Sequence, residues 1–273
     1  LLLTLLIAGY AEAKKDSYTD LNKWKLVWSD EFNYKGLPDK AKWNFEVGFL
    51  RNQELQYYTD SKKENTRGGG GVLTIEARKE RIKNPNYDAN SPEWQKNREY
   101  AEYTSADITT QGKHYWTYGR IEVRAKLPTG AGMWPAIWTL GENISTVGWP
   151  NCGEIDIMEN LGKEANKIYG TAHYGINNVH QSSGNNRDFS KPNADFHIYA
   201  IEWYPDRIEF FYDSTKYHTF PIDAAGEGEN NPFRKPHFIL LNLALGGWGG
   251  PVDDKILPQK YLIDYVRVYQ EKK

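Results

Sequence analysis

Short runs in which apolar and polar residues alternate with a period of two dominate this sequence, and the period of an α-helix is almost absent. Such alternation sends successive side chains to opposite faces of an extended strand. The clearest runs lie at residues 72–77, 119–127, 155–158, 197–203, 207–212, 238–245 and 261–269. They predict an all-β chain.

Turn signals separate the predicted strands. Glycine-rich stretches lie at 68–71 and 246–250, and only residues 204–206 separate two strong runs, which predicts a tight hairpin. Strands at this spacing without helices between them favour one antiparallel β-sandwich domain. The polar stretches 82–98 and 181–195 are predicted to be surface loops.

The amino-terminal residues 1–13 are apolar up to a small-residue pattern, Ala11-Glu12-Ala13, and a lysine-bearing polar stretch follows. This pattern is typical of the end of a secretory signal peptide, and it is shorter than the ~20 apolar residues of a membrane-spanning helix. We predict a partial signal peptide at 1–13, a short linker at 14–20 and one folded domain at 21–273. The mature protein is then secreted or periplasmic.

Composition excludes several classes of partner. The chain has 34 Lys and Arg against 36 Asp and Glu, with no basic block to follow a phosphate backbone, so nucleic acid is not expected to bind. A single cysteine, Cys152, excludes an internal disulfide and a thiolate zinc site. The 10 Trp and 19 Tyr suit either a β-sheet core or platforms for flat ligands.

Three acids fall within six residues of one predicted strand: Glu154, Asp156 and Glu159. Side chains two apart share a face of a strand, so the first two acids point away from Ile155. Glu159 has the opposite parity and would enter the core. A β-bulge near Met158 would restore all three acids to one face, and we predict one there because an unpaired buried carboxylate is costlier.

Two glutamates beside an aspartate suit glycoside hydrolysis, in which one carboxylate attacks the sugar and another protonates the leaving oxygen. Crowding of like charges raises the pKa of at least one acid, so a purely structural strand would avoid it. The alternative is a solvated acidic surface, which the apolar neighbours Ile155, Ile157 and Met158 disfavour.

The segment 153–162, GEIDIMENLG, resembles the catalytic signature of glycoside hydrolase family 16, in the form found in its laminarinases, the endo-β-1,3-glucanases. Further stretches resemble that family in order, at 26–32, 43–48, 52–59, 118–128, 132–140, 169–174 and 263–270. The resemblance covers nearly all of residues 24–270. It implies a jelly roll of two curved antiparallel sheets with a concave substrate cleft.

The resemblance also implies roles. Glu154 becomes the nucleophile of a retaining mechanism, Glu159 the general acid and base, and Asp156 the acid between them, which biases a proton toward Glu159. Indole faces stack on sugar rings. The substrate-binding residues implied are Asn44, Trp134, Trp138, Trp149, His173 and Asn242.

A structural calcium ion is a further implication, with Glu31, a carbonyl at Gly71 and Asp264 as ligands. No catalytic cofactor is expected, and the histidines show no spacing typical of a zinc site. We expect a monomer acting on a polysaccharide, β-1,3-glucan. The alternatives are mixed-linkage glucan, an algal galactan such as agar, carrageenan or porphyran, and a β-glucan-binding module without turnover, which would typically lack both glutamates.

Overall fold

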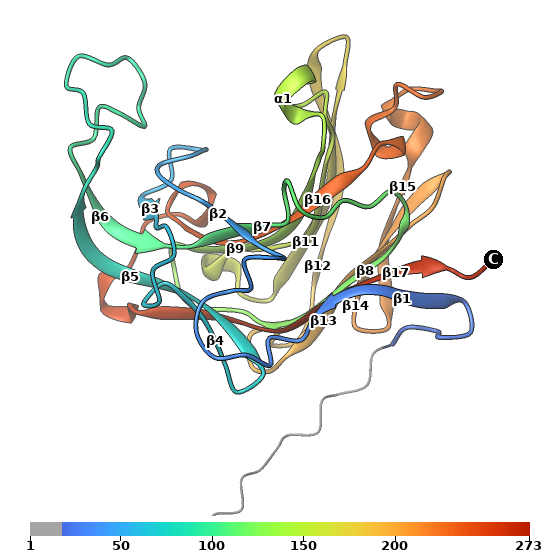
Figure 1. The fold of residues 1–273 in the computed structure, drawn as a ribbon, viewed down its shortest axis with the longest axis horizontal. Coiled ribbons are helices and arrows are strands. Elements are labelled where there is room, and N and C mark those ends of the chain that lie inside the picture. The colour runs from blue at the N-terminus through green and yellow to red at the C-terminus, as the bar shows by residue number, and fades with distance from the viewer. Residues whose placement is uncertain (1–17) are drawn as a thin grey trace, which may run out of the picture.

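Two antiparallel sheets form the domain in a computed structural model, which describes residues 18–273 (Figure 1). The first sheet contains, in spatial order, β15 (Thr215–Pro221), β14 (Arg207–Tyr212), β13 (His197–Trp203), β8 (Gly119–Lys126), β17 (Gln259–Glu271), β5 (Val72–Lys83), β6 (Tyr100–Ser105) and β3 (Gln56–Tyr58). In addition, β1 (Trp24–Asp30) pairs with β17, and β4 (Thr66–Gly69) pairs with β5. The second sheet contains β12 (Val179–Asp188), β11 (Lys167–Ile176), β10 (Glu154–Asn160), β9 (Met133–Gly141), β16 (His237–Leu245), β7 (Asp107–Thr109) and β2 (Asn44–Glu46).

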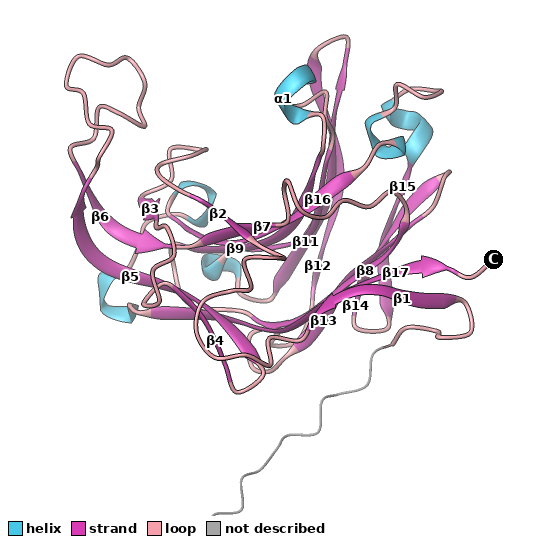
Figure 2. Ribbon diagram, viewed as in Figure 1, coloured by secondary structure: helices cyan, strands magenta, loops and turns pink. Residues whose placement is uncertain are grey.

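Helices in the described part of the chain are short (Figure 2). They are α1 (Ile144–Val147) and 3-10 turns at Gly162–Glu164, Ile222–Ala225, Pro232–Arg234, Gly247–Gly249 and Asp254–Ile256. None of them is long and apolar enough to cross a membrane. The architecture confirms the predicted all-β antiparallel sandwich of the jelly-roll type, with one parallel pairing, between β3 and β6.

The predicted strands form with small shifts in their bounds, except that β5 continues beyond residue 77 to Lys83 and so includes the first two residues of the loop predicted at 82–98. The two runs around residues 204–206 form β13 and β14 and pair as the predicted hairpin. The prediction of a loop at 181–195 was wrong for its first part, because residues up to Asp188 form β12 and pair with β11, and it was confirmed for residues 189–195. Both faces of β12 are largely exposed, so its polar sequence carries no alternation that would have indicated a strand.

The core lies between the two sheets. The strands β11 and β14 alternate buried and partly exposed residues, as a strand with one face on the core should. Large aromatic side chains such as Trp43, Trp203 and Phe210 are fully buried there. Most of the aromatic excess in the sequence therefore fills the sandwich. The strand β16 is buried on both faces, so a second set of apolar residues covers the face of its sheet that points away from the core.

The stretch 14–20, predicted to be a linker, is described only from residue 18. The hydroxyl of Thr19 donates a hydrogen bond to Glu122 Oε2 at 2.7 Å and accepts one from Arg120 Nε at 2.8 Å. Packing against the first sheet therefore begins before residue 21. The predicted signal peptide at 1–13 lies outside the described residues.

Candidate active site

A β-bulge brings the three acids of β10 to one face. Between Asp156 and Met158 the register of β10 against β9 shifts by one residue. Ile157 and Met158 are both fully buried in the core, so the bulge absorbs the extra residue there. This confirms the bulge predicted near Met158. It lets Glu159 point away from the core, together with Glu154 and Asp156.

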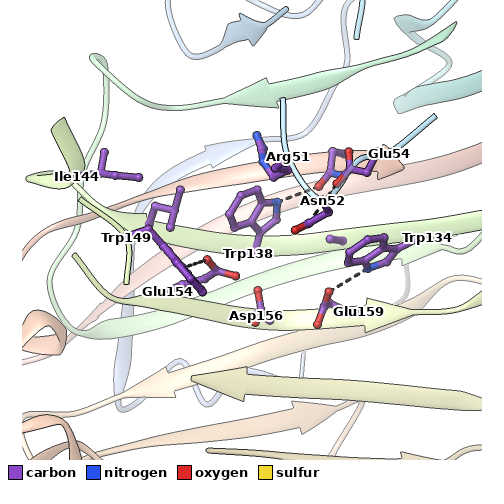
Figure 3. Close-up of a pocket in the computed structure, with 13 residues that line it drawn as sticks. Arg51, Asn52, Glu54, Trp134, Trp138, Ile144, Trp149, Glu154, Asp156 and Glu159 are labelled. Atoms are coloured by element: carbon purple, nitrogen blue, oxygen red, sulfur yellow. Dashed lines mark hydrogen bonds between the residues drawn. The ribbon is translucent and has the colours of Figure 1, made fainter. Parts of the chain in front are cut away.

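The three acids line an open pocket of about 360 Å³ on the second sheet, on the face that points away from the core. Figure 3 shows them in a row along β10, with Trp149 beside Glu154 and Trp134 beside Glu159. The remaining residues that line the pocket are Arg51, Asn52, Glu54, Ala136, Trp138, Leu140, Ile144 and Asn242.

Two indoles hold the two glutamates in place. Trp149 Nε1 donates a hydrogen bond to Glu154 Oε2 at 2.8 Å, and Trp134 Nε1 donates one to Glu159 Oε1 at 2.9 Å. Trp149 follows α1 and is 48% exposed, so much of its ring remains open to a ligand. The structure thus gives these tryptophans a polar contact with the acids in addition to the predicted stacking surface.

The third tryptophan, Trp138, is held by a chain of hydrogen bonds. Its Nε1 donates to Asn242 Oδ1 at 2.8 Å, and Asn242 Nδ2 donates to the hydroxyl of Tyr58, also at 2.8 Å. The Tyr58 hydroxyl in turn donates to Glu54 Oε2 at 3.1 Å. Asn242 therefore has the buried partners that a polar residue in an apolar strand requires.

His173 lies on β11 directly opposite Glu154 on β10. Its Nε2 is 3.0 Å from Asp156 Oδ2, and its Nδ1 is 2.9 Å from Nε2 of His180 on β12. The structure therefore brings His173 against the acids, although it does not line the pocket itself. His180, which no sequence motif indicated, extends this contact toward solvent.

Asn44 lies on the same face of the sheet but far from the acids. The strand register forms one row from Asp156 through Trp138, Leu240 and Thr109 to Asn44. Four strand spacings separate its ends, which is roughly 19 Å. Asn44 Nδ2 donates to the carbonyl of Gln111 at 2.8 Å and lies outside the pocket. Its role in substrate binding stays a prediction, for a sugar unit distant from the acids.

Arg51, Asn52 and Glu54 line the pocket from the chain between β2 and β3, and sequence reasoning did not single them out. The Arg51 guanidinium lies 4.8 Å from the centroid of the Trp138 ring and pairs with Asp107 at 3.1 Å. The resemblance included stretch 52–59, but only contacts with distant strands fix which of its side chains enter the pocket.

The predicted calcium ligands do not fit a cation as they are arranged. Both oxygens of Glu31 accept hydrogen bonds from Arg267, at 2.8 and 2.9 Å, and Asp264 Oδ2 accepts one from Arg124 at 2.7 Å. A calcium ion would have to displace two guanidinium groups. The site stays a prediction.

Melting curves recorded with a chelator and then with added calcium test the site. If calcium binds, the chelator should lower the melting temperature and added calcium should restore it, whereas superimposable curves would remove the site.

The fold and the site define a glycoside hydrolase: an open pocket on a β-sandwich, two indole-bound glutamates and an aspartate between them. The model of glycosyl hydrolases family 16 matches residues 52–267. The chain belongs to that family.

Individual relatives are similar over almost the whole chain. A beta-glucanase from Rhodothermus marinus is 44% identical over 98% of this chain and 93% of its own length. The X-ray structure of the laminarinase from Rhodothermus marinus matches with a TM-score of 0.79 at 44% identity, over 92% of this chain and 98% of that one. A structure from work on endo-acting O-glycanases of the human gut microbiota, which initiate mucin breakdown, matches with a TM-score of 0.87 at 39% identity, over 93% of each chain.

Proposed function

We propose that this glycoside hydrolase is a retaining endo-β-1,3-glucanase of the laminarinase type. The observation that carries the proposal is the bulged strand β10, which places Glu154 and Glu159 on one face with an indole N–H on each. The similarity to the laminarinase of Rhodothermus marinus supports the choice of substrate. Both glutamates are present, which disfavours a binding module without turnover.

In the proposed mechanism, the Glu154 carboxylate attacks the anomeric carbon while the bond from that carbon to the leaving oxygen breaks. Glu159 gives its proton to the leaving oxygen. The resulting glycosyl ester on Glu154 is then attacked by a water whose proton passes to Glu159, and Glu154 leaves as a carboxylate. The net configuration at the anomeric carbon is retained.

Burial sets the protonation of these acids. It raises the pKa of Glu154 to about 8, with the charge of Asp156 as the next cause. It raises the pKa of Glu159 to about 7, while the hydrogen bond from Trp134 lowers it in part. Burial also raises the pKa of Asp156 well above its ordinary value. The acids therefore share protons at neutral pH, as closely spaced buried carboxyl groups do.

This sharing predicts a bell-shaped pH dependence of kcat/KM with its maximum between pH 7 and 8. The reactive enzyme has one proton on the pair, on Glu159. Because the pKa of Glu154 is the higher of the two, this is the minor of the two singly protonated forms, and its share of them does not change with pH. Because the two groups titrate near 7 and 8, activity falls by about tenfold per pH unit below pH 7, where both are protonated, and above pH 8, where both are ionised. Initial rates on laminarin from pH 4 to 10 measure this, and a maximum at pH 4 to 5 would contradict it.

A second candidate substrate is an O-glycan of mucin, cleaved by the same mechanism. The observation that favours it is the higher TM-score of 0.87 to the structure from the mucin O-glycanase study, against 0.79 for the laminarinase. Mixed-linkage glucan and the algal galactans are further alternatives within the same mechanism.

A reducing-sugar assay with product sizing separates these substrates. The panel is laminarin, mixed-linkage β-glucan, agarose, carrageenan and mucin O-glycans, with the Glu154→Gln variant as the blank for each. We expect turnover of laminarin to oligosaccharides of several lengths, the pattern of an endo-acting enzyme. If only a galactan or only mucin glycans were cleaved, β-1,3-glucan would be rejected as the substrate, but the proposed mechanism would not be contradicted.

We also propose that the protein is exported and acts as a monomer. The support for export is the apolar segment at 1–13 followed by the lysine-bearing stretch. Fractionation of the cells that make this protein naturally, together with size-exclusion chromatography of the recovered product, tests both proposals. Retention of uncleaved protein in the cytoplasm would overturn the first, and elution at twice the monomer mass the second.

A further inference from the structure

The hairpin of β11 and β12 brings two histidines together beside the row of acids. Both residues of its turn, at 177–178, have positive φ angles of 53° and 62°, which a two-residue hairpin turn of this type requires. The turn fixes the register, which pairs Gly175 with His180 and so places His180 diagonally across from His173.

The same hairpin holds the segment that carries Trp149. Gly175, opposite His180, leaves room for Asn151, because a Cβ on Gly175 would lie 2.1 Å from Asn151 Oδ1. Asn151 Nδ2 donates a hydrogen bond to Asn178 Oδ1 in the turn, at 2.8 Å. The tip of the hairpin therefore lies against the chain that connects α1 with β10 (Figure 1).

His180 contacts two residues that themselves contact the acids. Its ring lies against the indole of Trp149, at 4.6 Å between centroids, and Trp149 donates to Glu154. It also stacks on the ring of His173, at 5.1 Å between centroids, and His173 Nε2 is 3.0 Å from Asp156 Oδ2. The mechanism proposed above uses both carboxyl groups but neither histidine.

The two imidazoles constrain each other's protons. His173 Nδ1 and His180 Nε2 are 2.9 Å apart, which is hydrogen-bond distance, so one nitrogen donates and the other accepts. Partial desolvation, and next the charge of His173, lowers the pKa of His180. A neutral imidazole has a single N–H. A neutral His173 can therefore donate from Nε2 to Asp156 only if its Nδ1 accepts from His180.

We propose that His180 is a positioning residue, whose Nε2–H donates to His173 Nδ1 and holds His173 in the tautomer that donates from Nε2 to Asp156. A hydrogen bond donated to the charged form of a carboxyl group favours that form, so the proton that the acids share is biased toward the two glutamates. The expected effect on the rate rests on the proposed function, whereas the tautomer of His173 does not.

NMR of the full chain labelled with ¹⁵N-histidine tests the tautomer independently of activity. At neutral pH we expect His173 to have an unprotonated Nδ1 and a protonated Nε2. His180→Gln should keep this state, because the amide nitrogen of glutamine stands near the place of the imidazole Nε2. His180→Asn and His180→Phe remove the donor and should give a mixture of both tautomers. A protonated Nδ1 in the wild type, or an unchanged tautomer in the Asn and Phe variants, would overturn the proposal.

The same variants separate the hydrogen bond from ring packing in the reaction. The rates are measured on whichever glycan of the panel above the wild type cleaves. His180→Phe keeps a ring against Trp149 and should lower kcat by about tenfold with an unchanged KM, since the loss is one of positioning. His180→Asn should lower kcat by about as much, whereas His180→Gln should keep most of it.

The matched control is Val179→Ala, on the opposite face of β12 and 60% exposed, which should leave kcat unchanged. Equal kcat in the Gln and Phe variants of His180 would overturn its positioning role in the reaction. If the wild type cleaved no glycan of the panel, the proposed function would be rejected, and the NMR result alone would decide the tautomer.

Discussion

Glu154→Gln should lower kcat on laminarin by roughly 10⁴-fold or more, the loss typical of a removed nucleophile. The amide has nearly the shape of the carboxylate and can still meet the indole of Trp149, so the fold should persist. Initial rates, together with circular dichroism to check folding, measure this. Glu142→Gln is the matched control, because Glu142 is exposed just beyond β9 and should leave the rate unchanged.

Azide distinguishes a lost nucleophile from a merely disturbed site. In Glu154→Ala, azide can occupy the vacated space and attack the anomeric carbon of an aryl β-laminarioligoside from the face opposite the leaving group. The product is then the α-glycosyl azide, formed with a single inversion. Recovery of the β-glycosyl azide, or a near-wild-type rate in Glu154→Gln, would remove Glu154 from the assigned role.

Glu159→Gln should have an effect that depends on the leaving group. On laminarin, whose leaving oxygen needs a proton, kcat should fall by roughly 10³-fold or more, within the range that general acid–base groups contribute together with their electrostatics. On an aryl glycoside with an acidic phenol the first step needs little protonation, so a burst of phenol followed by slow turnover is expected. Stopped-flow absorbance of the released phenol measures the burst.

Azide again gives a distinct product for this residue. In Glu159→Ala, azide can attack the glycosyl ester on Glu154 without general-base assistance, which speeds turnover and yields the β-glycosyl azide through two inversions. Equal losses on laminarin and on the aryl glycoside, with no effect of azide, would mean that Glu159 does not act as the acid and base. The two glutamate variants therefore predict azides of opposite configuration.

Much of the fold was predictable because burial imposes a period on the sequence. The strands β13 and β14 each have a face on the core, and their apolar residues mark it. The bulge in β10 was predictable for the same reason, since the cost of a carboxylate among isoleucines exceeds that of one unpaired residue. In β12 neither face is buried, so the sequence has no alternation of apolar and polar residues, and the strand cannot be predicted from it.

The parts of the site that sequence reasoning missed depend on contacts between distant segments. Arg51 enters the pocket through its contacts with Trp138 and Asp107, which come from other strands. His180 reaches His173 only because the hairpin of β11 and β12 folds back on itself. A local sequence pattern predicts on which face of a strand a side chain lies, but it does not predict which distant residues a loop side chain contacts.

Glu154 and Glu159 are proposed to cleave β-1,3-glucan with retention of configuration. Proton NMR of the anomeric signals during the first minutes of laminarin hydrolysis tests it most directly, before mutarotation mixes the products. The β-anomer of the new reducing end should appear first, and the α-anomer should grow in later. Initial appearance of the α-anomer would contradict it.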